Sequence, residues 1–263
     1  VSMNMIRSIL DLLGVTDRET VNECMTRVLR DEFIRNLYER LNSMEAYFDT
    51  VDYFAALTGT SGRGRDYRQY CGMRAAMIGG MTMGLARPSV YCPLSHPLIA
   101  MFDDKMEARL IEAAGGFLAN TSIERDKKPG ITISPEEFNR MAPDMIIMSD
   151  SAAWPVNDFT DYCIEKGLDA PALQKGRVFN LYPYRISAAP DWILGLMASA
   201  NAIHPGVFSF NMEAEAEEFF NTFYQIPFSS VRSRSFPARL RGKGNKTNFL
   251  DGINVSNTHM PVT

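Results

Sequence analysis

The sequence predicts an α/β fold: a three-layer α/β lobe with a mostly parallel sheet, preceded by a helical N-terminal region and a long bridging helix. From Arg87 onward, short apolar segments typical of buried strands alternate with amphipathic segments of helical length. The residues before position 62 show helical periodicity instead, without strand-like alternation. The chain has 263 residues, 46% of them hydrophobic, which is enough for one or two domains with a hydrophobic core.

The helical N-terminal region is expected to comprise residues 1–61. Thr16 and Glu19 have the spacing of a capping box, in which each side chain accepts a hydrogen bond from a free backbone N–H group at the helix start. Apolar residues follow at intervals of three, four and their multiples: Val21, Cys24, Val28, Leu37, Leu41 and Met44. This pattern predicts one amphipathic helix of about 25 residues. The glycine-rich segment 59–64 lacks the Lys-Ser/Thr ending of a phosphate-binding loop, so we interpret it as a linker.

A long bridging helix is predicted for residues 62–86. Its glycines, Gly72, Gly79, Gly80 and Gly84, lower helix stability relative to alanine but permit close packing against another backbone. The segment also contains methionines at helical spacing: Met73, Met77, Met81 and Met83. Methionine thioethers bind soft ions such as Cu(I), but several methionines on one helix are more typical of a core. We therefore expect these side chains to be buried.

The α/β lobe is expected to comprise residues 87–228. The apolar run 145–148 is typical of a strand buried on both faces of a parallel sheet. Ser134, Pro135 and Glu137 together indicate a helix start with a capping box. The predicted strands are 89–92, 145–148 and 177–180, and the predicted helices are 103–113, a helix after residue 134, 158–166, 192–203 and 212–224.

Composition narrows the possible partners and compartments. The formal net charge of −4 and the pI near 5.5 give no global attraction to nucleic acid, although residues 229–263 form a basic tail. No apolar run approaches the roughly 20 residues of a transmembrane segment. The first residues lack the pattern of a secretory signal, so we expect a periplasmic or extracytoplasmic protein if a leader was removed, and otherwise a cytoplasmic one. Four cysteines without CxxC spacing indicate buried thiols, which favours a reducing compartment.

Several motifs occur in an order that resembles the C-terminal lobe of the substrate-binding proteins of iron–siderophore, haem and cobalamin ABC importers, whose two lobes are joined by one long helix. The motifs are Ala113-Ala-Gly-Gly, Ile133-Ser-Pro-Glu-Glu-Phe, Pro143-Asp-Met-Ile-Ile-Met-Ser, Lys175-Gly-Arg-Val-Phe and Glu217-Glu-Phe-Phe-Asn-Thr-Phe-Tyr. The resemblance covers roughly Arg87 to Phe228 and implies a receptor that binds a metal complex without catalysis, with an ABC permease as partner. A complete receptor has a first α/β lobe of similar size. Here the helical N-terminal region or a second subunit must provide the facing half of the cleft.

Three loops are expected to carry the binding site, because ligands of open parallel sheets bind beyond the carboxyl ends of the strands. The first loop, 93–98, contains Ser95 and His96, and the imidazole of His96 can ligate iron or cobalt or hydrogen-bond a carboxylate. The second loop, 149–156, contains Asp150 and Trp154. The indole of Trp154 is suited to stacking on a macrocycle or an aromatic chelator, with plain core packing as the alternative.

The third loop, 181–187, has the richest polar chemistry. Tyr182 and Tyr184 can donate hydrogen bonds or bind ferric iron as phenolates, and Arg185 can pair with a propionate, a phosphate or a siderophore carboxylate. The alternative is that these side chains only cover a helix end. For a protein-bound metal, the candidate ligands are His96 and Tyr184.

The leading functional hypothesis is a non-catalytic binding protein for an iron–siderophore, haem or corrinoid, with haem, corrinoid or a ferric chelate as the bound ligand. An alternative is an intracellular metal-cofactor carrier or assembly factor, which explains the unpaired thiols. A subunit of a nitrogenase-like or dehydratase-like reductase is a further alternative, but such enzymes hold iron–sulfur clusters through several cysteines. No Ser/His/Asp or Cys/His arrangement is readable, so we do not expect an enzyme. A second subunit or a homo-oligomer remains open as a partner.

Overall fold

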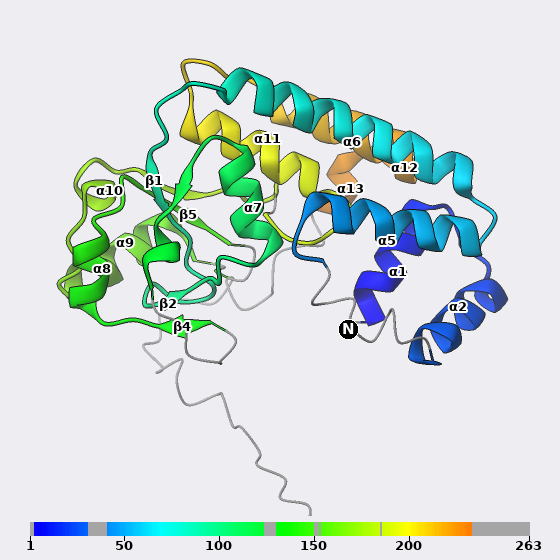
Figure 1. Cartoon of the computed structure of the whole chain (residues 1–263), viewed down its shortest axis with the longest axis horizontal. Helices are drawn as coiled ribbons and strands as arrows, with labels where there is room; N and C mark the ends of the chain where they lie inside the picture. Colours follow the sequence, from blue (N-terminus) through cyan, green and yellow to red (C-terminus); the bar gives the residue numbers. More distant parts are fainter. Residues whose placement is uncertain are drawn as a thin grey trace, which may run out of the picture.

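The computed structural model describes residues 3–30, 41–123, 130–149, 152, 154–184 and 186–232. Helices gather at one end of the molecule and the α/β lobe lies at the other (Figure 1). Two long helices, α6 (Ser61–Thr82) and α12 (Met212–Tyr224), run side by side along one face, where Arg74 of α6 forms an ion pair with Glu218 of α12 at 2.9 Å. This arrangement confirms the predicted fold class.

The N-terminal region contains the helices α1 (Met3–Leu12), α2 (Arg18–Arg30) and α5 (Met44–Leu57). The prediction of one continuous helix up to Met44 is wrong, because residues 41–43 form a turn and the Ser43 hydroxyl caps α5 by accepting a hydrogen bond from the Ala46 amide. The start of α2 also differs from the prediction. The carboxylate of Asp17, rather than the hydroxyl of Thr16, accepts the hydrogen bond from the Thr20 amide. Leu37, part of the predicted pattern, lies outside the described residues.

The helix α6 occupies the predicted bridging segment, but its methionines are exposed. Met73, Met77, Met81 and Met83 are 59%, 43%, 43% and 82% exposed, so the expectation of core packing is wrong. The buried face of α6 instead consists of Gly64, Tyr67, Cys71 and Ile78. A Cβ atom at Gly64 would lie 2.8 Å from the Cβ of Ala55 in α5, whereas Cβ atoms at Gly72, Gly79, Gly80 and Gly84 would meet nothing within 4 Å. Only Gly64 therefore serves the close packing that the glycines suggested.

The main sheet has four parallel strands in the order β3-β1-β5-β6. Their bounds are β1 Ser89–Tyr91, β3 Phe117–Leu118, β5 Met145–Met148 and β6 Val178–Asn180. The pairs Val90–Met145 and Ile147–Phe179 set the register. A separate antiparallel ribbon is formed by β2 (Ile99–Ala100) and β4 (Ile131–Thr132). The sequence predicted β1, β5 and β6 but missed the two-residue strands, which show no periodicity.

Helices cover both faces of the sheet. Their bounds are α7 Met106–Ala113, α8 Pro135–Met141, α9 Val156–Glu165, α10 Pro171–Gln174, α11 Trp192–Ile203 and α13 Phe228–Arg232, with a 3-10 turn at Ala119–Ser122. The predicted capping box of α8 is present, with Ser134 and Glu137 each accepting from the other's backbone amide. The helix α13 takes up the first residues of the predicted tail, and residues 233–263 lie outside the described part.

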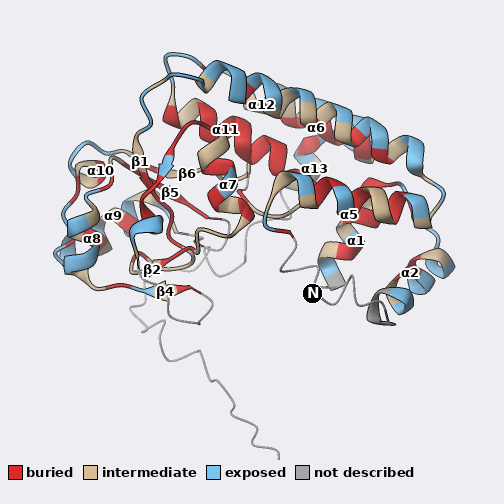
Figure 2. Cartoon of the chain, in the orientation of Figure 1, coloured by how far each residue is buried: buried red, intermediate tan, exposed pale blue. Residues whose placement is uncertain are grey.

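Alternate strand residues pack into two cores. Val90, Met145 and Ile147 belong to the larger core, whereas Tyr91 and Ile146 belong to the core under α8 and α9. The larger core continues into the N-terminal helices and includes Ile6, Phe48, Tyr67, Trp192 and Phe223. Figure 2 shows that α11 is buried along nearly its whole length, because it lies between the sheet and the long helices. The sheet, which positions the candidate site, is therefore rigidly supported on both sides.

Candidate functional site

Three loops meet at one edge of the main sheet. The strands β1, β5 and β6 are neighbours and run in parallel, so their carboxyl ends point to the same edge. The loops that follow them are residues 93–98, 149–156 and 181–187, and we call these three loops the rim. The structure therefore gathers the three predicted loops in one place. Two predicted rim residues, Asp150 and Arg185, lie outside the described residues.

The first and second rim loops are joined by hydrogen bonds and ring contacts. The Ser149 hydroxyl donates to the Leu94 carbonyl at 2.5 Å, and the Trp154 indole N–H donates to the Ser95 carbonyl at 3.0 Å. The His96 ring meets the Trp154 ring edge-on, with 5.9 Å between the centroids. Trp154 is half-buried and packs against the smaller core, and its role in stacking on a ligand stays a prediction. The structure thus brings Ser95, His96 and Trp154 together.

His96 presents a neutral imidazole. Its Nδ1 atom accepts a hydrogen bond from the Leu98 amide at 3.2 Å, and its ring contacts the edge of Tyr162 with 4.7 Å between the centroids. Burial lowers the pKa of His96, and the positive charge of Lys166 lowers it further. Because Nδ1 is the acceptor, the neutral ring carries its proton on Nε2. His96 is therefore arranged to donate a hydrogen bond, whereas metal ligation through Nε2 would require moving this proton to Nδ1.

Asn180 joins the second and third rim loops, a role that the sequence reasoning missed. Its side-chain amide donates to the Trp154 carbonyl at 2.8 Å, and its side-chain oxygen accepts from the Tyr182 amide at 2.9 Å. Asn120 makes similar bonds to the segments on either side of the first loop. Its side-chain oxygen accepts a hydrogen bond from the Cys92 amide at 3.0 Å. Its side-chain NH2 group donates to the carbonyls of Cys92 and Met101 at 2.8 and 3.0 Å. The only sequence signal for Asn180 was an amide at the end of a strand.

The two tyrosines of the third loop have different surroundings. Tyr182 is half-buried, and its backbone amide donates a hydrogen bond to the side-chain oxygen of Asn180. Tyr184 stacks on Phe228 of α13, with 5.9 Å between ring centroids and 19° between planes, and it packs against the larger core. Trp154 packs against the smaller core on the other face of the sheet. The ring of Tyr184 is therefore turned towards the helices rather than towards the His96–Trp154 pair.

Among the described residues, no group of three or more His, Cys, Asp or Glu side chains is placed to hold a metal ion. All four cysteines are free and buried, as predicted. Burial raises the pKa of Cys71 and Cys92, so these thiols stay protonated at neutral pH and are poor metal ligands.

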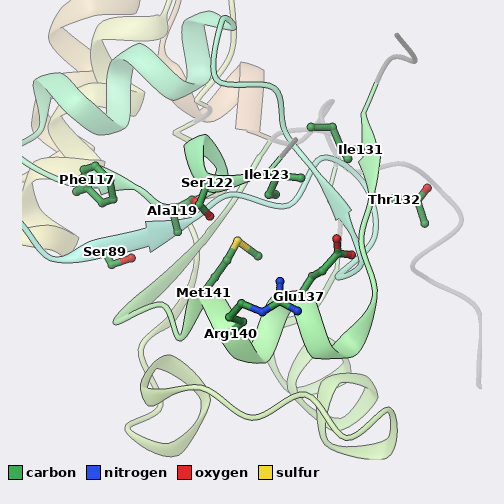
Figure 3. Close-up of a pocket in the computed structure, with 10 residues that line it drawn as sticks. All are labelled: Ser89, Phe117, Ala119, Ser122, Ile123, Ile131, Thr132, Glu137, Arg140 and Met141. Carbon is green, nitrogen blue, oxygen red and sulfur yellow. The ribbon is translucent and has the colours of Figure 1, made fainter. Parts of the chain in front are cut away.

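A cavity of about 670 Å³ lies beside the edge strand β3, and the described residues that line it do not belong to the rim (Figure 3). Its walls come from the strands β1, β3 and β4, from the turn after β3 and from α8. The lining residues are Ser89, Phe117, Ala119, Ser122, Ile123, Ile131, Thr132, Glu137, Arg140 and Met141. None of the predicted site residues is among them.

The architecture, a parallel-sheet lobe with a long helix and a loop rim at the carboxyl edge, is a fold found in solved structures of periplasmic solute-binding proteins. No protein-family model and no curated protein sequence match this chain. Solved structures do match, at low sequence identity, so the likeness shows the fold. Within the described residues, no helix combines the length and apolar composition that a membrane span requires.

Three of the similar structures illustrate this class. A periplasmic solute-binding protein from Veillonella parvula has 17% identity and a TM-score of 0.62, over 74% of this chain and 60% of its own. CeuE from Helicobacter pylori with Ni(II) bound has 13% identity and a TM-score of 0.63, over 74% of this chain and 63% of its own. MolA from Haemophilus influenzae bound to molybdate has 17% identity and a TM-score of 0.58, over 70% of this chain and 57% of its own. This chain therefore spans about 60% of the length of the proteins it resembles.

Proposed function

We propose that this chain is a non-catalytic binding protein for a metal chelate or tetrapyrrole, such as an iron–siderophore, haem or a corrinoid, and that it serves an ABC importer outside the cytoplasmic membrane. The observation that carries the proposal is the rim: three loops at the carboxyl edge of a rigid parallel sheet, fixed to one another by Ser149, Trp154 and Asn180. Preformed loops of this kind bind without a large ordering cost.

The chemistry of the rim supports a ligand that brings its own metal ligands. The described residues offer no cluster for a bare metal ion, and the buried thiols are protonated. The rim offers instead a donor on His96 Nε2, the half-buried Tyr182 and the half-buried indole of Trp154. Such groups recognise the oxygen acceptors and flat rings of a chelate or macrocycle. Proteins of the same fold hold Ni(II), a Ni-His complex and molybdate.

The rim supplies one wall of a cleft. Because this chain spans about 60% of the length of its structural neighbours, we propose that the helical N-terminal region or a second subunit supplies the opposite wall. A one-walled site on its own is expected to bind more weakly than a closed cleft, since it buries less of the ligand.

The test uses the two tryptophans of the chain, of which Trp154 lies at the rim and Trp192 is fully buried. Haemin, cyanocobalamin and a ferric trihydroxamate are titrated into the protein, and tryptophan emission is followed alongside the visible absorbance retained after ultrafiltration. We expect one of the three to quench emission saturably. Trp154→Phe should abolish most of the quenching, and His96→Phe should weaken binding about tenfold through loss of a hydrogen bond to a charged group.

A matched control is His204→Gln, because His204 lies at Gly115 and not at the rim. The proposal fails if none of the three compounds is retained by the protein. It also fails if a retained compound binds His96→Phe and Trp154→Phe as tightly as the natural chain, since the binding would then lie elsewhere.

A further inference from the structure

In the described part of the chain, the cavity beside β3 combines an apolar wall with one cationic side chain, Arg140. Figure 3 shows Glu137, Arg140 and Met141 on α8, facing Ala119 and Ser122 across the cavity. Phe117, Ile123 and Ile131 supply further apolar surface, and the ring of Phe117 is 49% exposed. The volume of about 670 Å³ lies within the roughly 300–1,000 Å³ of sites for small organic molecules.

An edge strand beside a cavity also suggests an added peptide strand, but the backbone of β3 is already engaged. The Gly116 carbonyl accepts two hydrogen bonds from the guanidinium of Arg87, at 3.0 and 2.5 Å. The Leu118 carbonyl accepts from the Thr121 hydroxyl at 2.8 Å. These side chains occupy acceptors at both ends of the two-residue strand, so strand addition is disfavoured. The cavity therefore favours a small molecule over an extended peptide.

The charges of the cavity favour an anion. Arg140 lines the cavity and, within the described part of the chain, its guanidinium has an electrostatic interaction with the exposed carboxylate of Glu136, one turn earlier on α8. Among the described lining residues the one carboxylate, Glu137, is used by the helix cap, where it accepts from the Ser134 amide at 2.7 Å. Glu136, the other acidic group of α8, is fully exposed and is not part of the lining. Arg140 is thus the cationic group of the described lining. Its exposed partner Glu136 competes only weakly, and a guanidinium pairs well with a carboxylate, phosphate or sulfonate.

We propose that this cavity binds a small amphipathic anion. Arg140 pairs with the anionic group, and Phe117, Ile131 and Met141 cover the apolar part. The described lining shares no residue with the rim, and occupancy of the cavity does not depend on the function proposed for the rim. The strand β4 forms part of the cavity wall. Its partner β2 directly follows the first rim loop in the sequence.

The test is a fluorescence titration of the full chain with anilinonaphthalene sulfonate, an aromatic anion that brightens in an apolar site. We expect saturable binding with a stoichiometry of one at the cavity. Arg140→Gln should weaken this binding about tenfold, as expected for loss of a charge-assisted hydrogen bond. Arg140 is exposed, so this change leaves the fold intact.

Two controls locate the probe. Arg65→Gln removes an exposed arginine from α6 and should leave the affinity unchanged. Met77→Glu places a charge in the exposed methionine face of α6 and should also leave it unchanged. The proposal is overturned if Met77→Glu weakens binding while Arg140→Gln does not, because the probe would then sit on α6. Equal affinity of all variants, or no binding by the natural chain, overturns it as well.

Discussion

At the scale of single residues, the rim depends on a few polar side chains that bridge segments far apart in the sequence. Asn120, Ser149 and Asn180 each bond to the backbone of another loop, over separations of 19 to 55 residues. Asn120 and Ser149 are buried, where an unpaired polar group costs about 1–3 kcal/mol. These bonds therefore make each loop conformation depend on its neighbours, and they hold His96 and Trp154 in contact.

The titration of His96 tests its environment. Burial, and then Lys166, lowers the pKa of His96 below its ordinary value of 6.5. On acidification the unfolded chain takes up this proton first, so the stability that His96 contributes is complete above its ordinary pKa and is lost as the pH falls towards the folded pKa. We expect the proton resonance of the His96 ring to titrate below 6.5. Between about pH 7.5 and about pH 5.5, His96→Gln should lose less unfolding free energy than the natural chain.

Lys166→Gln serves as the companion variant, because it removes the nearby positive charge while leaving the ring buried. The pKa of His96 should rise in this variant but remain below its ordinary value, since burial is the larger cause. A ring that titrates at or above its ordinary value in the natural chain would show that His96 is solvated or paired with an anion, and the neutral-donor role would be wrong.

The candidate site was predictable from the sequence only in part. The rule that ligands bind beyond the carboxyl ends of parallel strands located the three loops, and so placed Ser95, His96 and Trp154 near one another. The bridging side chains were not predictable, because no local pattern reveals which distant carbonyl an asparagine or serine will bond. The packing of Tyr184 on Phe228 was missed for the same reason.

At the scale of elements, α6 shows how a helix can be predicted correctly while its faces are not. The helix has nearly the predicted bounds, but methionine spacing alone does not say which face is turned inward. Long elements such as α11 and α12 were predictable because their periodicity extends over three turns or more. The strands β2, β3 and β4 have two residues each and exist because neighbouring segments pair with them, so no local signal announces them.

The glycines of α6 give a direct test of its faces. Gly79 and Gly80 have helical backbone and open space around the Cβ position, so Gly79→Ala and Gly80→Ala should each stabilise the protein by about 0.5–1 kcal/mol. Gly64→Ala, on the same helix, is the matched control. Its Cβ would lie 2.8 Å from that of Ala55, so this change should destabilise by about 1–3 kcal/mol. Urea denaturation of the three variants measures these differences.

A destabilising effect of Gly80→Ala would contradict the assignment of an exposed face to this part of α6. If Gly80→Ala lowers the unfolding free energy, its face of the helix must touch another backbone in solution, as the glycine spacing first suggested. The reading of this face as solvent-exposed would then be wrong.

At the scale of the whole molecule, the N-terminal helices and the α/β lobe share one core. Phe48 of α5 packs edge-on against Trp192 of α11, with 5.6 Å between ring centroids, and Tyr67 of α6 contacts Phe223 of α12 at 5.6 Å. The guanidinium of Arg63 in α6 donates hydrogen bonds to the carbonyls of Leu12 and Phe223. The sequence boundaries at positions 61 and 86 stay predictions, but these contacts imply that the regions on either side stabilise one another.

This shared core predicts cooperative unfolding. Phe48→Ala, a change in the N-terminal region, should lower the unfolding free energy of the whole chain by about 3 kcal/mol, because Phe48 is only 6% exposed. The urea transition followed by the emission of Trp154 and Trp192, which both lie in the lobe, should shift together with the loss of far-ultraviolet circular dichroism. The control Ile164→Ala, at a side chain that is 64% exposed on α9, should change stability by no more than about 0.5 kcal/mol. Two separate transitions, with the midpoint of the tryptophan transition unchanged by Phe48→Ala, would show instead that the lobe folds alone, as a detachable half of a larger receptor would.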